Sequence, residues 1–214
     1  SFSSKKTHTS SKLGDSQAPV IDGMLGESIW HQGEWSSDFT QYQPNEGAKP
    51  SVNTAFKIIY DHQFLYIGVQ CFDDQPEQIE SRMSRRDDDV GDWVSITLDS
   101  YHDLRSAFSF TVTAAGVKGD RMISLNGTIE DPSWNPIWYA KSHINQDGWT
   151  AEMKIPLSQL RFGKLEHQVW GLQVVRRFFR NDEKSVWQRI PLDAPGWISE
   201  FGELHGLTAI KPQK

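Results

Sequence analysis

The sequence of 214 residues has a single cysteine, no long apolar run and no dense basic cluster. Because Cys71 has no partner, the chain forms no internal disulfide, and its place among Leu65, Ile67 and Val69 predicts a small buried side chain. No apolar stretch approaches the roughly 20 residues of a membrane span, so we expect no transmembrane segment in this chain. Its 22 basic and 28 acidic residues give a net charge of −6, and no stretch gathers enough Lys and Arg to follow a phosphate backbone. We therefore expect no nucleic-acid partner.

Long helical patterns are also scarce, and period-two alternation takes their place. Residues 93–99, 108–113 and 149–155 each have one apolar and one polar face, as strands do. Less regular strands are expected at residues 53–60, 64–72, 117–125, 137–144, 169–178 and 204–210, hairpin turns at 60–64 and 145–149, and short helical turns at 26–31, 76–80 and 156–160. The pattern predicts an all-β fold: an antiparallel two-sheet β-sandwich, jelly-roll-like in its connections, with a few short helical turns.

The composition divides the chain into two parts. Residues 1–17 are rich in Ser, Lys and Thr and lack periodicity, which predicts a flexible N-terminal leader. Residues 18–214 carry the strand patterns, and β-sandwiches of this size often have one core. We expect a single β-sandwich domain over residues 18–214.

Tryptophan is abundant, with nine residues, and a core of this size is unlikely to hide all of them. Trp134 and Trp138 flank a turn-rich Asn-Pro pair, so one or both are candidates to line a groove; alternatively, Trp138 begins a strand and packs inward. Trp187 and Trp197 allow the same two interpretations. The tryptophans on strand or helix faces are expected to be structural: Trp30, Trp93, Trp149 and Trp170.

Charged residues gather before the strand at 93–99. The acidic members are Asp87, Asp88, Asp89 and Asp92, which follow Arg85 and Arg86. Four carboxylates within six residues suggest a calcium site, with Asp99 or Asp120 as a further ligand, because calcium takes several oxygen ligands. The spacing is not that of an EF-hand. The alternative is a solvated acidic loop paired to its own arginines.

A second charged cluster ends the strand at 169–178. Arg176, Arg177 and Arg180 are placed to offer guanidinium groups to a polar or anionic ligand. Salt bridges to Asp182 or Glu183 explain them equally well.

Motifs for catalysis are lacking. The sequence contains no nucleophile elbow, phosphate-binding glycine loop or HExxH phrase. Glu152 or Glu130 is a conceivable half of a glycosidase pair, but the alternation around Glu152 points its side chain toward solvent or a neighbouring Arg. We expect the chain not to be an enzyme.

Several phrases, in this order and spacing, resemble carbohydrate-binding module family 9-like domains, in particular those found N-terminal to outer-membrane β-barrel proteins of unknown function. The matching phrases span residues 19–210: Pro19-Val20-Ile21-Asp22-Gly23 with Trp30, Tyr60-Asp61, Leu65-Tyr66-Ile67-Gly68-Val69, Arg85-Arg86-Asp87 with Asp92 to Asp99, Gly148-Trp149 with Ala151-Glu152 and Ile155-Pro156-Leu157, Leu160-Arg161-Phe162, Trp170-Gly171 and Phe201-Gly202-Glu203-Leu204. The resemblance implies a β-sandwich that clamps a sugar between two tryptophans and carries structural calcium. At the positions implied to contact sugar, this chain has Asp89 for the first clamp tryptophan and Thr111 for an arginine, with Trp197 near the second clamp position.

We therefore expect a non-catalytic carbohydrate-binding recognition module for a glycan or another polar small ligand, within a larger exported protein of the periplasm or outer membrane of a Gram-negative bacterium. A larger protein that breaks down polysaccharide fits this expectation. The expected ligand-binding residues are Trp134, Trp138, Trp197, Arg85, Arg86 and Arg177. The alternative is a structural domain that docks on an outer-membrane β-barrel in the same chain and binds no sugar, since the usual clamp residues are replaced.

Overall fold

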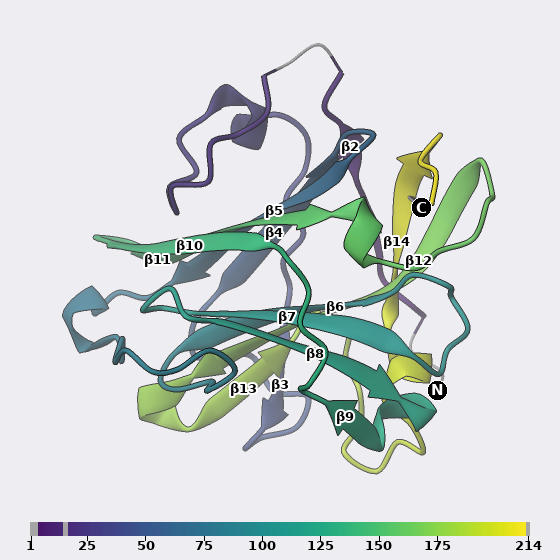
Figure 1. Cartoon of the computed structure of the whole chain (residues 1–214). Coiled ribbons are helices and arrows are strands. Elements are labelled where there is room, and N and C mark those ends of the chain that lie inside the picture. Colours follow the sequence, from purple (N-terminus) through teal and green to yellow (C-terminus); the bar gives the residue numbers. More distant parts are fainter. Residues whose placement is uncertain (1–3, 15–16, 213–214) are drawn as a thin grey trace.

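The computed structural model describes residues 4–14 and 17–212, in which two β-sheets pack face to face (Figure 1). The five-stranded sheet has the order β10-β11-β5-β4-β2. The nine-stranded sheet has the order β1-β14-β12-β6-β7-β8-β9, with β13 paired to β12 and β3 paired to β13. The strands are β1 (Thr7–Thr9), β2 (Ser11–Lys12), β3 (Thr40–Gln43), β4 (Thr54–Tyr60), β5 (Phe64–Phe72), β6 (Trp93–Asp99), β7 (Ala107–Thr113), β8 (Lys118–Ser124), β9 (Ile129–Asp131), β10 (Tyr139–Asn145), β11 (Gly148–Pro156), β12 (His167–Phe178), β13 (Glu183–Val186) and β14 (Gly202–Thr208).

Alternation places the core between the two sheets. On β6 the side chains of Val94, Ile96 and Leu98 are fully buried, and they share one apolar cluster with residues of β5 and β11 from the other sheet. Strands β6, β7 and β8 pair antiparallel, so the residues that alternate with the buried ones share the outer face of the sheet. The structure confirms the predicted all-β two-sheet sandwich.

The helical elements are single 3-10 turns. They are η1 (Ser28–His31), η2 (Pro76–Gln78), η3 (Leu125–Gly127), η4 (Leu157–Gln159), η5 (Phe179–Asn181) and η6 (Ile198–Glu200). Three of them, η1, η2 and η4, lie where the sequence predicts short helical turns. Among the described residues, no helix has both the length and the apolar character that crossing a membrane requires.

Two local predictions are also confirmed. The expected hairpins connect β4 to β5 and β10 to β11, and both pairs are antiparallel. Cys71 is buried on β5, and this burial raises the pKa of its thiol to about 12. The thiol is therefore protonated and unreactive at neutral pH.

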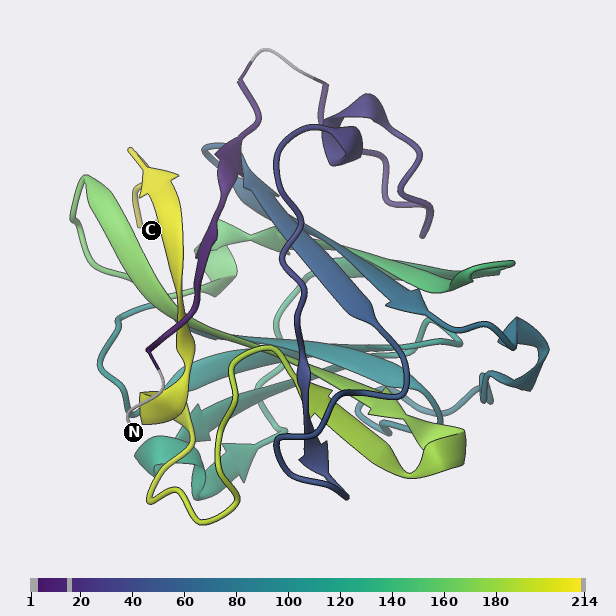
Figure 2. The same cartoon turned by 180° about the vertical axis from the view of Figure 1, so that it is seen from behind.

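The N-terminal segment differs from the flexible leader that its composition predicts. In the described part, β1 pairs in parallel with β14 and β2 pairs in parallel with β4 (Figure 2). His8 and Leu13 are buried there. Strands of two or three residues are too short to show periodicity, which is why the sequence pattern does not reveal them. Residues 1–3 and 15–16 of the expected leader lie outside the described residues.

One buried imidazole fixes β1 against the five-stranded sheet. His8 Nε2 accepts a hydrogen bond from Ile58 N at 3.2 Å, and His8 Nδ1 lies 2.6 Å from Ser36 Oγ. Because Nε2 is an acceptor, the ring is neutral and carries its proton on Nδ1. Burial, together with the nearby Lys57 ammonium, lowers the pKa of His8 to about 4.

This neutral histidine makes the stability of the fold sensitive to acid. A histidine whose pKa is lowered by folding stabilises the native state above its unfolded pKa of about 6.5, and this contribution is lost as the pH falls toward 4. The difference in unfolding free energy between the wild type and His8→Gln is therefore expected to shrink over this range, by at most about 1.4 kcal/mol per pH unit. Urea unfolding at several pH values measures it, with His62→Gln, an exposed histidine, as the matched control. A difference that stays constant with pH would contradict this prediction.

Candidate ligand-binding groove

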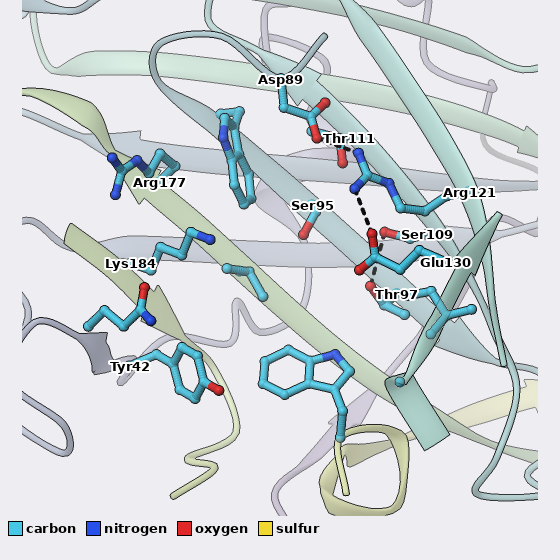
Figure 3. A pocket seen from close by; sticks show the side chains of 16 residues that line it. Tyr42, Asp89, Ser95, Thr97, Ser109, Thr111, Arg121, Glu130, Arg177 and Lys184 are labelled. Carbon is cyan, nitrogen blue, oxygen red and sulfur yellow. Dashed lines mark hydrogen bonds and ion pairs between the residues drawn. The ribbon is translucent and has the colours of Figure 1, made fainter. Parts of the chain in front are cut away.

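A groove lies on the outer face of the nine-stranded sheet, on the side away from the core (Figure 3). Its volume is about 710 Å³, within the range of roughly 300–1,000 Å³ that small-molecule sites occupy. Its lining comes from β3, β6, β7, β8, β9, β12 and β13, and from the segments that carry Asp89, Gly127 and Trp197.

The floor of the groove consists of small hydroxyl side chains. Alternation turns Ser95 and Thr97 of β6, and Ser109 and Thr111 of β7, away from the core. The register sets Ser95 opposite Thr111 and Thr97 opposite Ser109, and Thr97 donates a hydrogen bond to Ser109 over 3.2 Å. Because these side chains are short while their neighbours are long, the sheet surface is hollow here and presents hydroxyl groups to a ligand.

Aromatic side chains stand at the rim. Trp93, at the start of β6, and Trp197, just before η6, are half-buried and line the groove together with Tyr42 of β3. The Tyr42 and Trp197 ring centroids lie 5.3 Å apart. Indole faces at the edge of a hydroxyl-lined hollow are surfaces on which an apolar ring face can rest.

The η3 turn positions Trp197. Asn126 Oδ1 accepts hydrogen bonds from the backbone N–H groups of Trp197 and Ser199, at 3.2 and 2.9 Å. The next residue, Gly127, has a φ of +99°, and a Cβ at this position would lie 2.6 Å from Trp197 Cβ. Glycine is required because the two segments approach so closely in a left-handed conformation.

A charged triplet forms one side of the groove. Arg121 of β8 donates to Asp89 Oδ2 at 2.5 Å and to Glu130 Oε2 at 3.0 Å (Figure 3). Gly119 lets the Asp89 loop come close, since a Cβ there would lie 2.8 Å from Asp89 Oδ1. Burial raises the pKa of Asp89 even though the Arg121 charge opposes this shift. Arg121 keeps unused N–H groups, so the triplet offers both donors and acceptors to hydroxyl groups.

The structure brings only part of the sequence-predicted ligand site into this groove. Trp197 and Arg177 line it. Trp138 has 1% of its surface exposed and donates from Nε1 to Asp120 Oδ2 at 2.8 Å, which corrects the expectation that it contacts a ligand and supports the alternative of inward packing. Trp134 is half-buried, with its ring centroid 5.0 Å from that of Phe108, and does not line the groove.

The two arginines that precede the acidic run also lie outside the groove lining. Arg86 donates to Asp120 Oδ2 at 2.5 Å and to the Pro136 carbonyl at 3.0 Å, so it fastens two loops together. Arg85 is exposed. The expected ligand contacts of Arg85 and Arg86 are therefore not supported by their positions.

The predicted calcium ligands do not converge. Asp92 is buried and accepts from Phe179 N at 2.7 Å, Asp87 accepts from Asp120 N at 3.0 Å, and Asp88 is exposed. Asp89 is paired with Arg121 in the groove. This corrects the expected metal site: sequence proximity puts these carboxylates on one loop, but each one serves a different contact.

The further ligands suggested for that site are also engaged elsewhere. Asp120 accepts from Arg86 and Trp138, and Asp99 accepts from the backbone of Leu104 at 2.8 Å.

Another group of carboxylates does converge, between β11 and the segment that carries Asp22 and Glu27. Across the part of the chain that the structure describes, only Asp22, Glu27 and Glu152 bring three such ligand atoms within 4.8 Å of one another, and this triad could hold a metal ion. Glu152 Oε1 accepts from the backbone of Asp22 and Gly23, at 3.1 and 2.9 Å, and Oε2 accepts from Trp30 Nε1 at 3.1 Å. Glu152 is fully buried, which corrects the expectation that it faces solvent or an arginine.

Sequence reasoning missed several residues of the groove. The expectation that Trp93 is structural is wrong, because the alternation that buries Val94 turns Trp93 outward with Ser95. Arg121 and Lys184 give no local signal, because the pairing of β8 with β7 and of β13 with β12 decides which side of the sheet they reach.

Comparisons with known proteins agree with this architecture. The family model described as "Carbohydrate family 9 binding domain-like" matches residues 21–190. A carbohydrate-binding module of family 9 from Caldicellulosiruptor kristjanssonii, solved with glucose, is 20% identical with a TM-score of 0.68, and the match covers 98% of this chain and 97% of that one. The structure of such a module with cellotriose is 21% identical with a TM-score of 0.68, and the match covers 98% of this chain and 100% of that one. A putative carbohydrate-binding protein from Bacteroides uniformis is 13% identical with a TM-score of 0.74, covering 94% of this chain and 99% of its own.

At these identities the solved structures show a shared fold, whereas the family model covers well over half of the chain. No curated protein sequence is significantly similar to it. By the match over residues 21–190, the chain belongs to the carbohydrate family 9 binding domain-like family.

Proposed function

We propose that this chain is a non-catalytic module that binds a carbohydrate in the groove on the outer face of the nine-stranded sheet. The observation that carries the proposal is the composition of that groove: hydroxyl groups on the floor, the Asp89, Arg121 and Glu130 triplet on one side, and the indoles of Trp93 and Trp197 at the rim. Sugar rings combine an apolar C–H face with a polar edge, so aromatic faces and fixed hydrogen-bonding groups suit them together.

The family adds independent support. Asp89, Thr111 and Trp197, the positions at which the resemblance implies sugar contact, all line the groove. The solved Caldicellulosiruptor kristjanssonii module, which has this fold, is in complex with glucose in one structure and with cellotriose in another. The replaced clamp tryptophan has a substitute in Trp93, four residues further along the chain, so an aromatic rim exists without the usual residue at Asp89.

The test is titration of the purified chain with neutral oligosaccharides, including glucose and cellotriose, followed by tryptophan emission and by calorimetry. Saturable binding that changes the emission is expected, because Trp93 and Trp197 are half-exposed before a ligand covers them. Ser95→Phe fills the floor while the rim tryptophans are kept, and it is expected to abolish the response; circular dichroism checks that this variant folds. Absence of heat and of emission change with every glycan, neutral or charged, would refute the proposal.

A second candidate function is docking on an outer-membrane barrel of the same larger protein, in the periplasm or outer membrane. A separate observation favours it. Tyr139, at the start of the edge strand β10, is 50% exposed, and Val20, which lines a shallow hollow with it, is 66% exposed; Ile137, two residues before this strand, is 65% exposed. Exposed apolar side chains around a shallow hollow favour protein contact. This function predicts that Tyr139→Ser changes partner binding and leaves glycan titrations unaltered.

We propose calcium as the ion for the triad of Asp22, Glu27 and Glu152. All three residues supply the hard oxygen ligands that calcium prefers, and Glu27 Oε2 is buried without a hydrogen-bond partner among the described residues. The test is whether calcium raises the melting temperature of the wild type but not that of Glu152→Gln.

A further inference from the structure

The floor of the groove is flanked by a row of residues that crosses four strands. The register sets Trp93 of β6 opposite Arg177 of β12, Arg177 opposite Lys184 of β13, and Lys184 opposite Gln43 of β3. All four side chains line the groove. The row thus places two cations directly opposite each other across an antiparallel strand pair, beside an indole and an amide.

This arrangement is unfavourable for the fold by itself. Directly opposed residues of an antiparallel pair have Cβ atoms only about 4.5–5.5 Å apart, and like charges in these positions repel. No carboxylate occupies the row to offset the repulsion. The two cations therefore call for an explanation other than stability.

Neither cation is neutralised inside the groove. Arg177 donates to Asp182 Oδ1 at 2.5 Å, but the Asp182 side chain is 88% exposed, and water screens such a pair. Within the part of the chain that the structure describes, Lys184 has no ion pair and no side-chain hydrogen bond; its Nζ lies 5.7 Å from the centre of the Trp93 ring. Its ammonium is thus held beside the indole with its hydrogen-bonding capacity unused.

The acidic side chains of the groove are committed elsewhere. Asp89 and Glu130 both bind Arg121 on the opposite side of the groove, and Figure 3 shows Arg177 and Lys184 apart from that triplet. The groove is therefore polarised. One side has two carboxylates around one guanidinium, and the other has two cations without a carboxylate from the groove.

We propose that the groove is selective for a saccharide that carries an acidic group, with the ring against Trp93 and the acid between Arg177 and Lys184. This inference rests on the proposed carbohydrate binding and names its ligand class. The shared chemistry is an anionic substituent on a pyranose, which a uronic-acid carboxylate or a sulfate ester supplies. Guanidinium and ammonium groups bind both strongly when they are partly shielded from water.

The test compares ligands that differ only in charge. Oligogalacturonate and its methyl ester share the same rings, but esterification removes the negative charges. The wild type is expected to bind the acid roughly tenfold more tightly than the ester, a ratio typical of one charge-assisted contact, and the ratio is expected to fall as salt is added. A neutral oligosaccharide, compared with its sulfate ester, shows whether sulfate or carboxylate is the acid that is recognised.

Variants test whether the two cations of this row, Arg177 and Lys184, cause the selectivity; we call them the cation row. Lys184→Gln is expected to remove most of the preference for acid over ester, because the affinity for the acid falls more than the affinity for the ester, and Arg177→Gln is expected to do the same. Lys211→Gln, an exposed lysine that does not line the groove, removes the same charge and is expected to leave the preference intact.

The outcomes separate this inference from the function on which it rests. Equal affinity within both pairs, acid against ester and sulfated against unsulfated, refutes acid selectivity and leaves neutral carbohydrate binding standing. A preference for acid that survives in Lys184→Gln and Arg177→Gln alike also refutes the inference, because the selectivity then arises elsewhere. Binding of neither ligand, nor of any neutral glycan, refutes both proposals.

Discussion

Replacing Trp197 by alanine is expected to weaken glycan binding at least about thirtyfold without unfolding the protein. A central aromatic contact contributes roughly 2 kcal/mol or more to binding, which corresponds to about this change in affinity. The Trp197 ring is held in place before the ligand arrives, since its centroid lies 5.3 Å from the Tyr42 ring and 5.9 Å from the Phe201 ring. Little conformational entropy is then lost on binding. Calorimetry with the tightest-binding glycan measures the loss, and the same loss is expected for Trp93→Ala.

The matched control is Trp134→Phe. Trp134 is also half-buried, but its ring packs against Phe108 and Phe110 at the edge of the core instead of lining the groove. Its replacement is expected to change stability slightly and glycan affinity not at all. If Trp134→Phe lowered the affinity while Trp197→Ala did not, the binding site would lie outside the groove.

Gly127→Ala tests the position of Trp197 without removing its indole. The added Cβ would lie 2.6 Å from Trp197 Cβ on a residue whose φ is +99°, so the loop that carries Trp197 must shift. An intermediate loss of affinity, with the tryptophan count unchanged, would show that the orientation of the ring matters as well as its presence.

The sequence was most informative where one residue's environment follows from its nearest neighbours along the chain. Alternation around Val94 was enough to predict both the buried and the outer face of β6, and equivalent patterns predicted the other long strands. The same rule turns Trp93 outward, whereas the expectation that large aromatic residues on strands are structural gives it no contact with a ligand. That expectation, rather than a missing signal, conceals one of the two rim tryptophans.

Other features depend on contacts that sequence spacing does not contain. The Asp87 to Asp92 run satisfied the chemistry of a calcium site, yet Asp92 is fixed by Phe179, which lies 87 residues further along the chain. Trp138 becomes structural because Asp120, on a neighbouring segment, accepts its indole N–H. The cation row arises only from the register of β12 and β13, which depends on how the hairpin between them closes.

Glu152→Ala is expected to destabilise the fold more than any groove variant, by at least about 3 kcal/mol. Its two carboxyl oxygens accept hydrogen bonds from three groups, the backbone N–H of Asp22, that of Gly23 and the indole of Trp30. Each buried donor left without an acceptor costs about 1–3 kcal/mol. The segment that contains Trp30 covers the outer face of the five-stranded sheet, so its detachment would also expose the apolar cluster formed with Ile59 and Tyr66.

The same carboxyl makes stability fall as the pH rises. Burial, and next the hydrogen bond with Asp22, raise the pKa of Glu152 to about 8 from an ordinary value of 4.5. A group whose pKa is raised by folding contributes its full stabilisation below the unfolded pKa and loses it as the pH rises through the folded value. In the presence of a chelator, the wild type is therefore expected to lose unfolding free energy between about pH 4.5 and pH 8, with a steepest slope of about 1.4 kcal/mol per pH unit.

Glu152→Gln isolates this titration because its amide resembles the protonated carboxyl but has no charge to gain. The wild type and Glu152→Gln are expected to have similar stability near pH 4.5 and to diverge as the pH rises, because only the wild type then loses stability, whereas the wild-type and His8→Gln curves converge on acidification. Together the two groups confine maximal stability to the interval between the loss of the neutral imidazole and the loss of the Glu152 proton. Calcium in the triad would compete with that proton and raise wild-type stability more at pH 8 than at pH 5. Parallel stability curves for the wild type and Glu152→Gln would contradict the prediction, because they would show that Glu152 is ionised in the native protein throughout.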